Sequence, residues 1–258
     1  MKFPERQLEK IVKQICQINK IQFKSLSEGF ILQLTKNNKT EYIYGYNFPC
    51  NNVVSSKICD DKAGCSEILT KNKIACMEHV FFMDGFYKDE EVLAIFKKFK
   101  NDVVVKPNTG TGGRDVYHCQ TKQELLNNIK KVLSHSINFT ISPFYTYDTE
   151  YRLIMYKDKP HIIYAKQRTT EWRHNLGLGA KVNEYVDLNI IKKLSTIAQR
   201  CVKTLKIKFC SVDIAELKNK QYKVVELNGG VMMEKYSLTN YKKTYSLYER
   251  VIKDIFAI

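Results

Sequence analysis

The chain lacks the features that mark several common protein classes. No apolar run approaches the ~18 residues that a membrane-spanning helix needs, and the eight cysteines form no CxxC pair. The five histidines are isolated, with none at metal-ligand spacing from another. These absences argue against a membrane span, a disulfide framework and a histidine–cysteine metal site, and they predict buried free thiols.

The start of the chain and its charge bear on compartment and partner. The first residues are polar and run into a helical pattern, so we find no signal peptide and expect a cytoplasmic protein. A net charge of +15 suits an anionic partner, such as ATP, a carboxylate-rich substrate or nucleic acid. The lysines are scattered among acids, however, and no basic stripe is interleaved with aromatic residues, which argues against nucleic acid.

Hydrophobic periodicity predicts a mixture of helices and strands in one compact unit of two or three lobes. Helices are expected at 5–18, about 61–71, 89–99, 122–133, 187–205 and from about 240 onward. Strands are expected at 22–35, 41–46, 74–79, 103–106, 115–117, 139–145, 150–156, 161–168, 209–217 and 222–227. Residues 169–184 are polar and contain glycine, which indicates a loop of functional length.

A glycine-rich stretch between two predicted strands is the first candidate site. Lys106 ends the entering strand, and the turn at 109–113 reads Thr-Gly-Thr-Gly-Gly. Its backbone can approach a ligand closely, and successive N–H groups can point at an anion. The spacing fits neither a Walker A loop nor a dinucleotide-binding fingerprint. The stretch is therefore either a flap over a nucleotide triphosphate or a plain hairpin with a glycine-rich turn.

The second candidate site lies in the predicted hairpin formed by 209–217 and 222–227. Antiparallel pairing sets Asp213 opposite Glu226, and Asn228 shares the face of Glu226. The opposite, apolar face is expected to carry Val212, Ile214, Val225 and Leu227. Two opposed carboxylates repel each other, so the pair needs a compensating cation. Oxygen ligands without histidine or cysteine favour Mg²⁺, and the alternative is a solvated polar face balanced by lysines.

Three other charged residues are ambiguous when taken singly. Lys62 stands at a predicted helix start, where it is either a surface lysine or an anion-binding group. Glu150 and Arg152 share one strand face. They form either a surface ion pair worth little or contacts to a ribose hydroxyl and to a carboxylate or phosphate.

The loop at 169–184 and the end of the strand before Glu150 are ambiguous too. Arg173 and Asn175 lie in this loop, which either closes over a phosphoryl group or is solvated. Phe144 and Tyr145 either flank a purine or belong to the core.

Taken in order, these residues resemble a known family. The phrases Asp61-Lys62, VVVKPNTGTGG, EYR, WRHN, SVDIAE and VVELNGGVMM resemble those of the ATP-grasp carboxylate–amine ligases. They look most like the peptide-forming members, namely ribosomal-protein glutamate ligases, cyanophycin synthetases and the ligase half of bifunctional glutathione synthetases. The resemblance covers the chain from about residue 55 to its end.

This resemblance implies an α+β fold of the ATP-grasp type, in which two α+β lobes sandwich ATP. It implies a reduced N-terminal region at 1–60, a small lobe and central part with the glycine-rich flap at 61–145, and a large lobe with the metal site at 146–258. The family usually has a larger N-terminal domain, so part of the substrate wall could be missing or come from another subunit. A homo-oligomer therefore stays open.

The resemblance also implies residue roles. Lys62 and Lys106 match phosphate-binding lysines, and Glu150 matches the ribose-binding acid. The implied nucleotide contacts are Lys62, Lys106, Thr109, Gly110, Thr111, Gly112, Gly113, Ser142, Phe144, Tyr145 and Glu150. The implied magnesium ligands are Asp213, Glu226 and Asn228, and the implied catalytic residues are Arg173, Arg152 and Asn175.

The implied activity is an ADP-forming ligation in which ATP activates a carboxylate as an acyl-phosphate and an amine then forms an amide or peptide bond. The cofactors would be ATP and about two Mg²⁺ ions, which Mn²⁺ is expected to replace. The substrates would be small-molecule or peptide carboxylates and amines, with no membrane partner. The alternative is a non-catalytic ATP-binding module on the same fold that acts through a partner.

Overall fold

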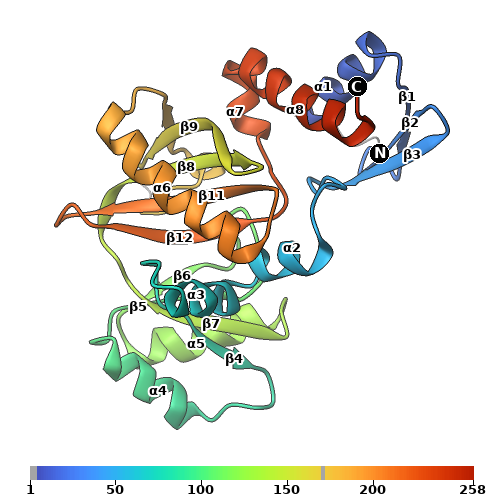
Figure 1. Cartoon of the computed structure of the whole chain (residues 1–258). Helices are drawn as coiled ribbons and strands as arrows, with labels where there is room; N and C mark the ends of the chain where they lie inside the picture. Colours follow the sequence, from blue (N-terminus) through green and yellow to red (C-terminus); the bar gives the residue numbers. More distant parts are fainter. Residues whose placement is uncertain (1–4, 170–171) are drawn as a thin grey trace.

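The computed structural model describes residues 5–169 and 172–258 and arranges them in two stacked lobes and a smaller N-terminal unit (Figure 1). Each lobe combines helices with its own antiparallel sheet, which confirms the predicted α+β class. In the described part of the chain, no helix is both long enough and apolar enough to cross a membrane.

The first lobe contains a four-stranded sheet in the order β4-β7-β5-β6. Its strands are β4 (Val80–Met83), β5 (Val103–Pro107), β6 (Tyr117–Cys119) and β7 (Asn138–Pro143). The helices are α4 (Asp89–Lys98) and α5 (Lys122–Leu133). Apolar residues such as Val92, Val105 and Ile129 are buried between them. The capping box predicted at Thr121 and Glu124 is confirmed at the start of α5, because each side chain accepts a backbone N–H of the other residue.

The second lobe contains a five-stranded sheet in the order β10-β9-β8-β11-β12. Its strands are β8 (Tyr147–Tyr156), β9 (Lys159–Gln167), β10 (Lys181–Asn183), β11 (Phe209–Leu217) and β12 (Tyr222–Asn228). The helix α6 (Leu188–Leu205), capped by Asp187 as predicted, covers one face of this sheet (Figure 1). The helices α2 (Val53–Asp60) and α3 (Lys62–Lys71) pack on β12.

The N-terminal unit is completed by the C-terminal helices. It contains α1 (Gln7–Ile18) and a sheet of β1 (Gln22–Leu26), β2 (Ile31–Lys36) and β3 (Lys39–Tyr44). The helices α7 (Glu234–Thr239) and α8 (Tyr241–Phe256) return to pack against α1 (Figure 1). Their shared core also takes in Phe209 and Tyr164 of the second lobe. The proposed boundaries at 60 and 145 stay a prediction.

Two predicted strands are wrong in their bounds. The stretch 22–35 forms β1 and β2, joined by a turn in which Ser27, Glu28 and Gly29 have positive φ. No proline marks this turn, and apolar residues resume directly after its three residues, at Phe30, so the pattern resembled one strand. The stretch 74–79 contributes only an isolated bridge between Cys76 and Val224, and the regular strand begins at Val80.

Two helices were missed, and the long loop has more structure than expected. The side chain of Asn52 accepts hydrogen bonds from the N–H groups of Val54 and Ser55. Asn52 is therefore the N-cap of α2, where the sequence pattern indicated only a break between elements. The short helix α7 precedes the predicted C-terminal helix. The 169–184 loop contains a 3-10 turn (Leu176–Leu178) and β10, while its residues 170–171 lie outside the described part.

The cysteines confirm the prediction of free thiols, most of them buried. All eight are described and unbridged. Five of them border the core beneath α6, namely Cys59, Cys65, Cys76, Cys201 and Cys210. Burial raises the pKa of the Cys201 thiol to about 12, which makes it an inert part of the core.

Candidate active site

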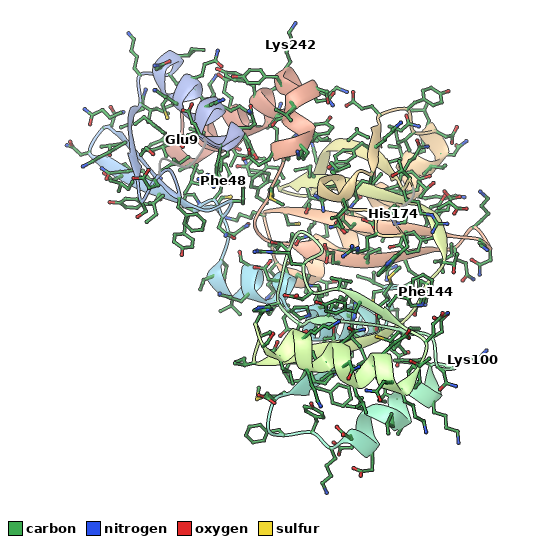
Figure 2. All side chains as sticks on the ribbon, turned by 180° about the vertical axis from the view of Figure 1, so that it is seen from behind. Glu9, Phe48, Lys100, Phe144, His174 and Lys242 are labelled. Carbon is green, nitrogen blue, oxygen red and sulfur yellow. The ribbon has the colours of Figure 1, made fainter. Side chains whose placement is uncertain are left out.

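A pocket lies between the two lobes. Figure 2 shows Phe144 and His174, both on the pocket wall, near the junction of the lobes, whereas Glu9 and Phe48 belong to the N-terminal unit. The predicted site residues on this wall are Lys62, Lys106, Gly110, Thr111, Gly112, Gly113, Ser142, Phe144, Tyr145, Glu150, Arg173, Asn175 and Glu226. Among the described residues, Thr109, Arg152, Asp213 and Asn228 are predicted site residues that do not line it.

The glycine-rich stretch forms one side of this pocket. The strands β5 and β6 pair antiparallel, with Val103 opposite Cys119, so the stretch between them is a hairpin loop that covers the pocket. Gly112 and Gly113 have φ values of 75° and 73°, which favour glycine. A Cβ atom on Gly113 would lie 2.8 Å from Oδ1 of Asn175. The loop therefore closes tightly on the 169–184 loop, as a flap would.

Three basic residues from separate segments meet at the flap. Lys62 is 9% exposed, which rules out a surface lysine, and its Nζ donates to the carbonyl oxygen of Gly110 at 2.9 Å. Arg173 Nη1 donates to the carbonyl oxygen of Gly113 at 2.9 Å. Burial lowers the pKa of Lys106 to about 8, and the positive charge of Lys62 acts in the same direction. Cations clustered in this way repel one another, and negatively charged phosphate oxygens bound between them would relieve that repulsion.

Part of the pocket wall is aromatic and apolar. The Phe144 ring stacks on His118 with ring centroids 3.9 Å apart, and Trp172 meets Phe144 edge-on at 5.4 Å. Val225 also lines the pocket, which corrects its predicted place on the apolar face. A bulge between Asp213 and Ile214 causes this change, because Ile214 pairs with Val224 and leaves Val225 out of the alternation. This part of the wall can contact a planar base.

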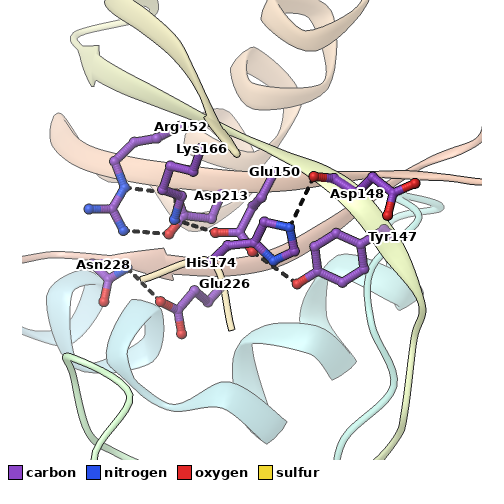
Figure 3. Close-up of polar contacts among 9 residues, drawn as sticks. All are labelled: Tyr147, Asp148, Glu150, Arg152, Lys166, His174, Asp213, Glu226 and Asn228. Carbon is purple, nitrogen blue, oxygen red and sulfur yellow. Dashed lines mark hydrogen bonds and ion pairs between the residues drawn. The ribbon is translucent and has the colours of Figure 1, made fainter. Parts of the chain in front are cut away.

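Buried ion pairs join the strands behind the pocket wall (Figure 3). Lys166 on β9 is the cross-strand partner of Glu150 on β8, and their side chains form an ion pair. Glu150 also accepts a hydrogen bond from the hydroxyl of Tyr147 at 2.9 Å. Glu150 and Lys166 both line the pocket. The alternative of a surface ion pair at Glu150 and Arg152 is therefore excluded, since Glu150 is buried and pairs with Lys166.

Asp213 occupies the centre of the same network. It accepts from Arg152 Nε at 2.8 Å and from Arg152 Nη2 at 2.6 Å, and Lys166 Nζ lies 3.2 Å from its Oδ1. Burial acts to raise the pKa of Asp213, but the charges of Arg152 and Lys166 outweigh it and lower that pKa to about 2. Asp213 is therefore a permanently charged acid held between two cations.

The oxygen donors at the end of β12 fit a hard metal ion. Asp213 and Glu226 are cross-strand partners, as predicted. Glu226 lines the pocket, and Asn228 Nδ2 donates to its Oε1 at 3.3 Å. The described residues contain no group of three histidine, cysteine or acidic side chains arranged for a metal, so the amide of Asn228 would be needed. Glu226 and Asn228 leave coordination positions for water and phosphate oxygens, as Mg²⁺ prefers.

Lys166, Tyr147 and Trp172 are pocket residues that sequence reasoning missed. Tyr156 pairs with Lys159, so the turn lies at 157–158, and regular pairing from it would set Glu150 opposite Ala165. The register shift between Ile154 and Met155 brings Lys166 opposite Glu150 instead. The pair could have been found only by allowing for such a bulge.

Two lobes around a pocket, a glycine-rich flap, two lysines and an acid–asparagine strand end together define the ATP-grasp class. The family model that describes the RimK-like ATP-grasp domain matches residues 59–245, and the chain belongs to this family. Among curated proteins, none matches the sequence.

Solved structures show the same fold. D-alanine–D-alanine ligase from Bacillus anthracis, complexed with ATP, is 21% identical with a TM-score of 0.59, over 71% of this chain and 60% of that one. The ATP-grasp ligase PsnB complexed with its minimal precursor is 15% identical with a TM-score of 0.55, over 74% and 57%. A bifunctional glutathione synthetase from Pasteurella multocida is 15% identical with a TM-score of 0.56, over 89% and 40%. The chain thus spans about 60% of the first of these proteins.

Proposed function

We propose that the protein is an ATP- and Mg²⁺-dependent ligase that joins a carboxylate to an amine with release of ADP and phosphate. The observation that carries this proposal is the meeting of Lys62, Lys106 and Arg173 at one pocket, with Glu226 on its wall. Phosphoryl transfer is catalysed mainly by positioning and by cations on the phosphate oxygens. These residues provide both, and no protein nucleophile is needed.

The proposed reaction has two steps. A carboxylate oxygen of the acid attacks the terminal phosphorus of ATP, the bond to ADP breaks, and an acyl-phosphate forms. The amine then attacks the acyl carbon, phosphate leaves with the former carboxylate oxygen, and the amine loses a proton. Arg173, hydrogen-bonded to the flap at Gly113, would stabilise charge on the transferred phosphoryl group, and Asn175 beside Gly113 would orient it.

Other residues would hold the nucleotide. The flap residues Thr109–Gly113 would cover the phosphates, while Ser142, Phe144 and Tyr145 would flank the base. Glu150 lines the pocket and keeps free acceptor capacity for a ribose hydroxyl, since a carboxylate can accept about four hydrogen bonds. Glu226 and Asn228 would hold magnesium, which neutralises phosphate charge when bound. Mn²⁺ is expected to replace it.

The first test is product release. ADP and phosphate are measured with Mg-ATP and a panel of amino acids, dipeptides and peptides, supplied in acid–amine pairs. Release that requires one particular pair supports a ligase and names its substrates. Binding of Mg-ATP without release for any pair would support a non-catalytic ATP-binding module, and release of AMP instead of ADP would contradict the acyl-phosphate route.

The second test removes the proposed metal contact. Glu226→Gln keeps the shape of the side chain and removes its charge, so turnover should fall by at least a hundredfold while the thermal melting temperature is kept. The matched control is Glu67→Gln, an exposed acid of α3 paired with Lys71, which should leave turnover unchanged. Wild-type turnover in the Glu226 variant would contradict the metal assignment.

A further inference from the structure

One face of the five-stranded sheet carries a row of charged residues that crosses four strands. Lys166 on β9 pairs with Glu150 on β8, Arg152 on β8 with Asp213 on β11, and Asp213 with Glu226 on β12. Figure 3 shows these side chains together. The row therefore contains two cations and three acids, and their pairing decides where a metal ion is needed.

The two cations are committed to Asp213 and Glu150. A carboxylate has about four acceptor sites, and three of those on Asp213 are filled by Arg152 Nε, Arg152 Nη2 and Lys166 Nζ. The side chain of Asp213 is 1% exposed and does not line the described pocket wall. Mg²⁺ requires octahedral geometry and usually keeps several waters, for which this position has no room.

Glu226 is in the opposite situation. It lines the pocket, it is only partly buried, and its hydrogen bond within the described residues comes from the neutral amide of Asn228 at 3.3 Å. None of the ion pairs described for residues 5–169 and 172–258 includes it. The negative charge left over in the row is therefore that of Glu226, next to the place of the phosphates.

We propose that Arg152 and Lys166 neutralise Asp213 in place of a second magnesium ion, so that this chain binds a single ion, at Glu226 and Asn228. Asp213 is then a positioning residue: it fixes Lys166, which in turn fixes Glu150 on the pocket wall. The inference rests on the proposed function, since it concerns the metal that accompanies ATP. It also explains how two opposed carboxylates are tolerated, because the compensating cations for Asp213 come from the chain itself.

The number of ions can be measured on the wild-type protein with Mn²⁺ and the non-hydrolysable analogue AMP-PNP. Two ions bridged by a carboxylate lie about 3.5–4 Å apart and give a coupled electron paramagnetic resonance spectrum. The expected result is one Mn²⁺ per chain with the sextet of an isolated ion. Two coupled ions per chain would overturn this inference alone, whereas failure to bind AMP-PNP would overturn the proposed function as well.

Variants separate the two acids. Glu226→Gln should weaken Mn²⁺ binding in the AMP-PNP complex at least tenfold, while Asp213→Asn should change it less than threefold. Equal losses in both would overturn the inference. Lys166→Met should leave Asp213 short of a cation and raise the count towards two Mn²⁺ per chain, with Arg168→Met, a half-buried cation paired with Asp148, as control. A count that stays at one in Lys166→Met would show that Lys166 does not stand in for an ion.

Discussion

The two faces of the five-stranded sheet both carry buried side chains but differ in what stabilises them. Under α6, Leu153 and Val212 are fully buried among apolar side chains. On the opposite face, Asp213 and Lys166 are nearly as inaccessible. The apolar face is stabilised by the apolar area that it removes from water, and it tolerates substitution of one apolar residue by another of similar volume. The charged face is stable only when every charge has its partner, so its residues act as a unit.

The largest expected effect is the loss of one acid from the charged face. Asp213→Ala leaves Arg152 and Lys166 buried with too little compensating charge, which should lower the free energy of unfolding by about 3–5 kcal/mol. Urea denaturation measures this change. A loss below about 1 kcal/mol would mean that water reaches Arg152 and Lys166. The charged face would then not depend on complete pairing of its charges.

On the apolar face, Leu153→Ala should remove about 2–5 kcal/mol of stability through lost burial and a residual cavity. Because Leu153 points away from the pocket, ATP affinity of the folded fraction should be unchanged. Urea denaturation measures the stability. Trp172 is the single tryptophan and lies on the pocket wall, so its fluorescence can report the ATP affinity. A parallel loss of ATP affinity would show that the faces are coupled.

Lys106→Ala tests the phosphate site with a smaller effect. Removing a charge-assisted contact should weaken ATP binding by about 1.5–3 kcal/mol, while stability is kept or raised, because a buried cation close to Lys62 is removed. Fluorescence titration measures the affinity, and Lys100→Ala, an exposed lysine labelled in Figure 2, is the control. Unchanged affinity would rule out this role for Lys106.

The smallest expected effect is on pH dependence. The pKa of Lys106 is about 8 in the free protein, and bound phosphate should raise it, so binding takes up a proton above that pH. ATP affinity should therefore fall as pH rises through this pKa, by roughly tenfold between pH 7 and 9. The same titration of Lys106→Ala should be flatter. An affinity that rises with pH in the wild type would contradict the sign.

The sequence was informative wherever local pattern decides structure. Antiparallel pairing about the predicted turn placed Asp213 opposite Glu226, and cap residues located α3, α5 and α6. The register shifts could not be predicted from the sequence, because a β-bulge depends on how a strand pairs with its partner strand. Both Val225 and Lys166 were misplaced or missed for that reason. The packing of α1 against α8 could not be predicted either, since it joins the two ends of the chain without a local signal.

The most direct test of the central claim follows the oxygen atoms of the acid substrate. Once the panel has identified an acid–amine pair, the acid is supplied with ¹⁸O in its carboxylate, and the released phosphate is analysed by mass spectrometry. An acyl-phosphate route predicts that each phosphate carries a single labelled oxygen, because that atom leaves with phosphate when the amine attacks. Unlabelled phosphate, or label in AMP, would contradict the proposed ligase mechanism.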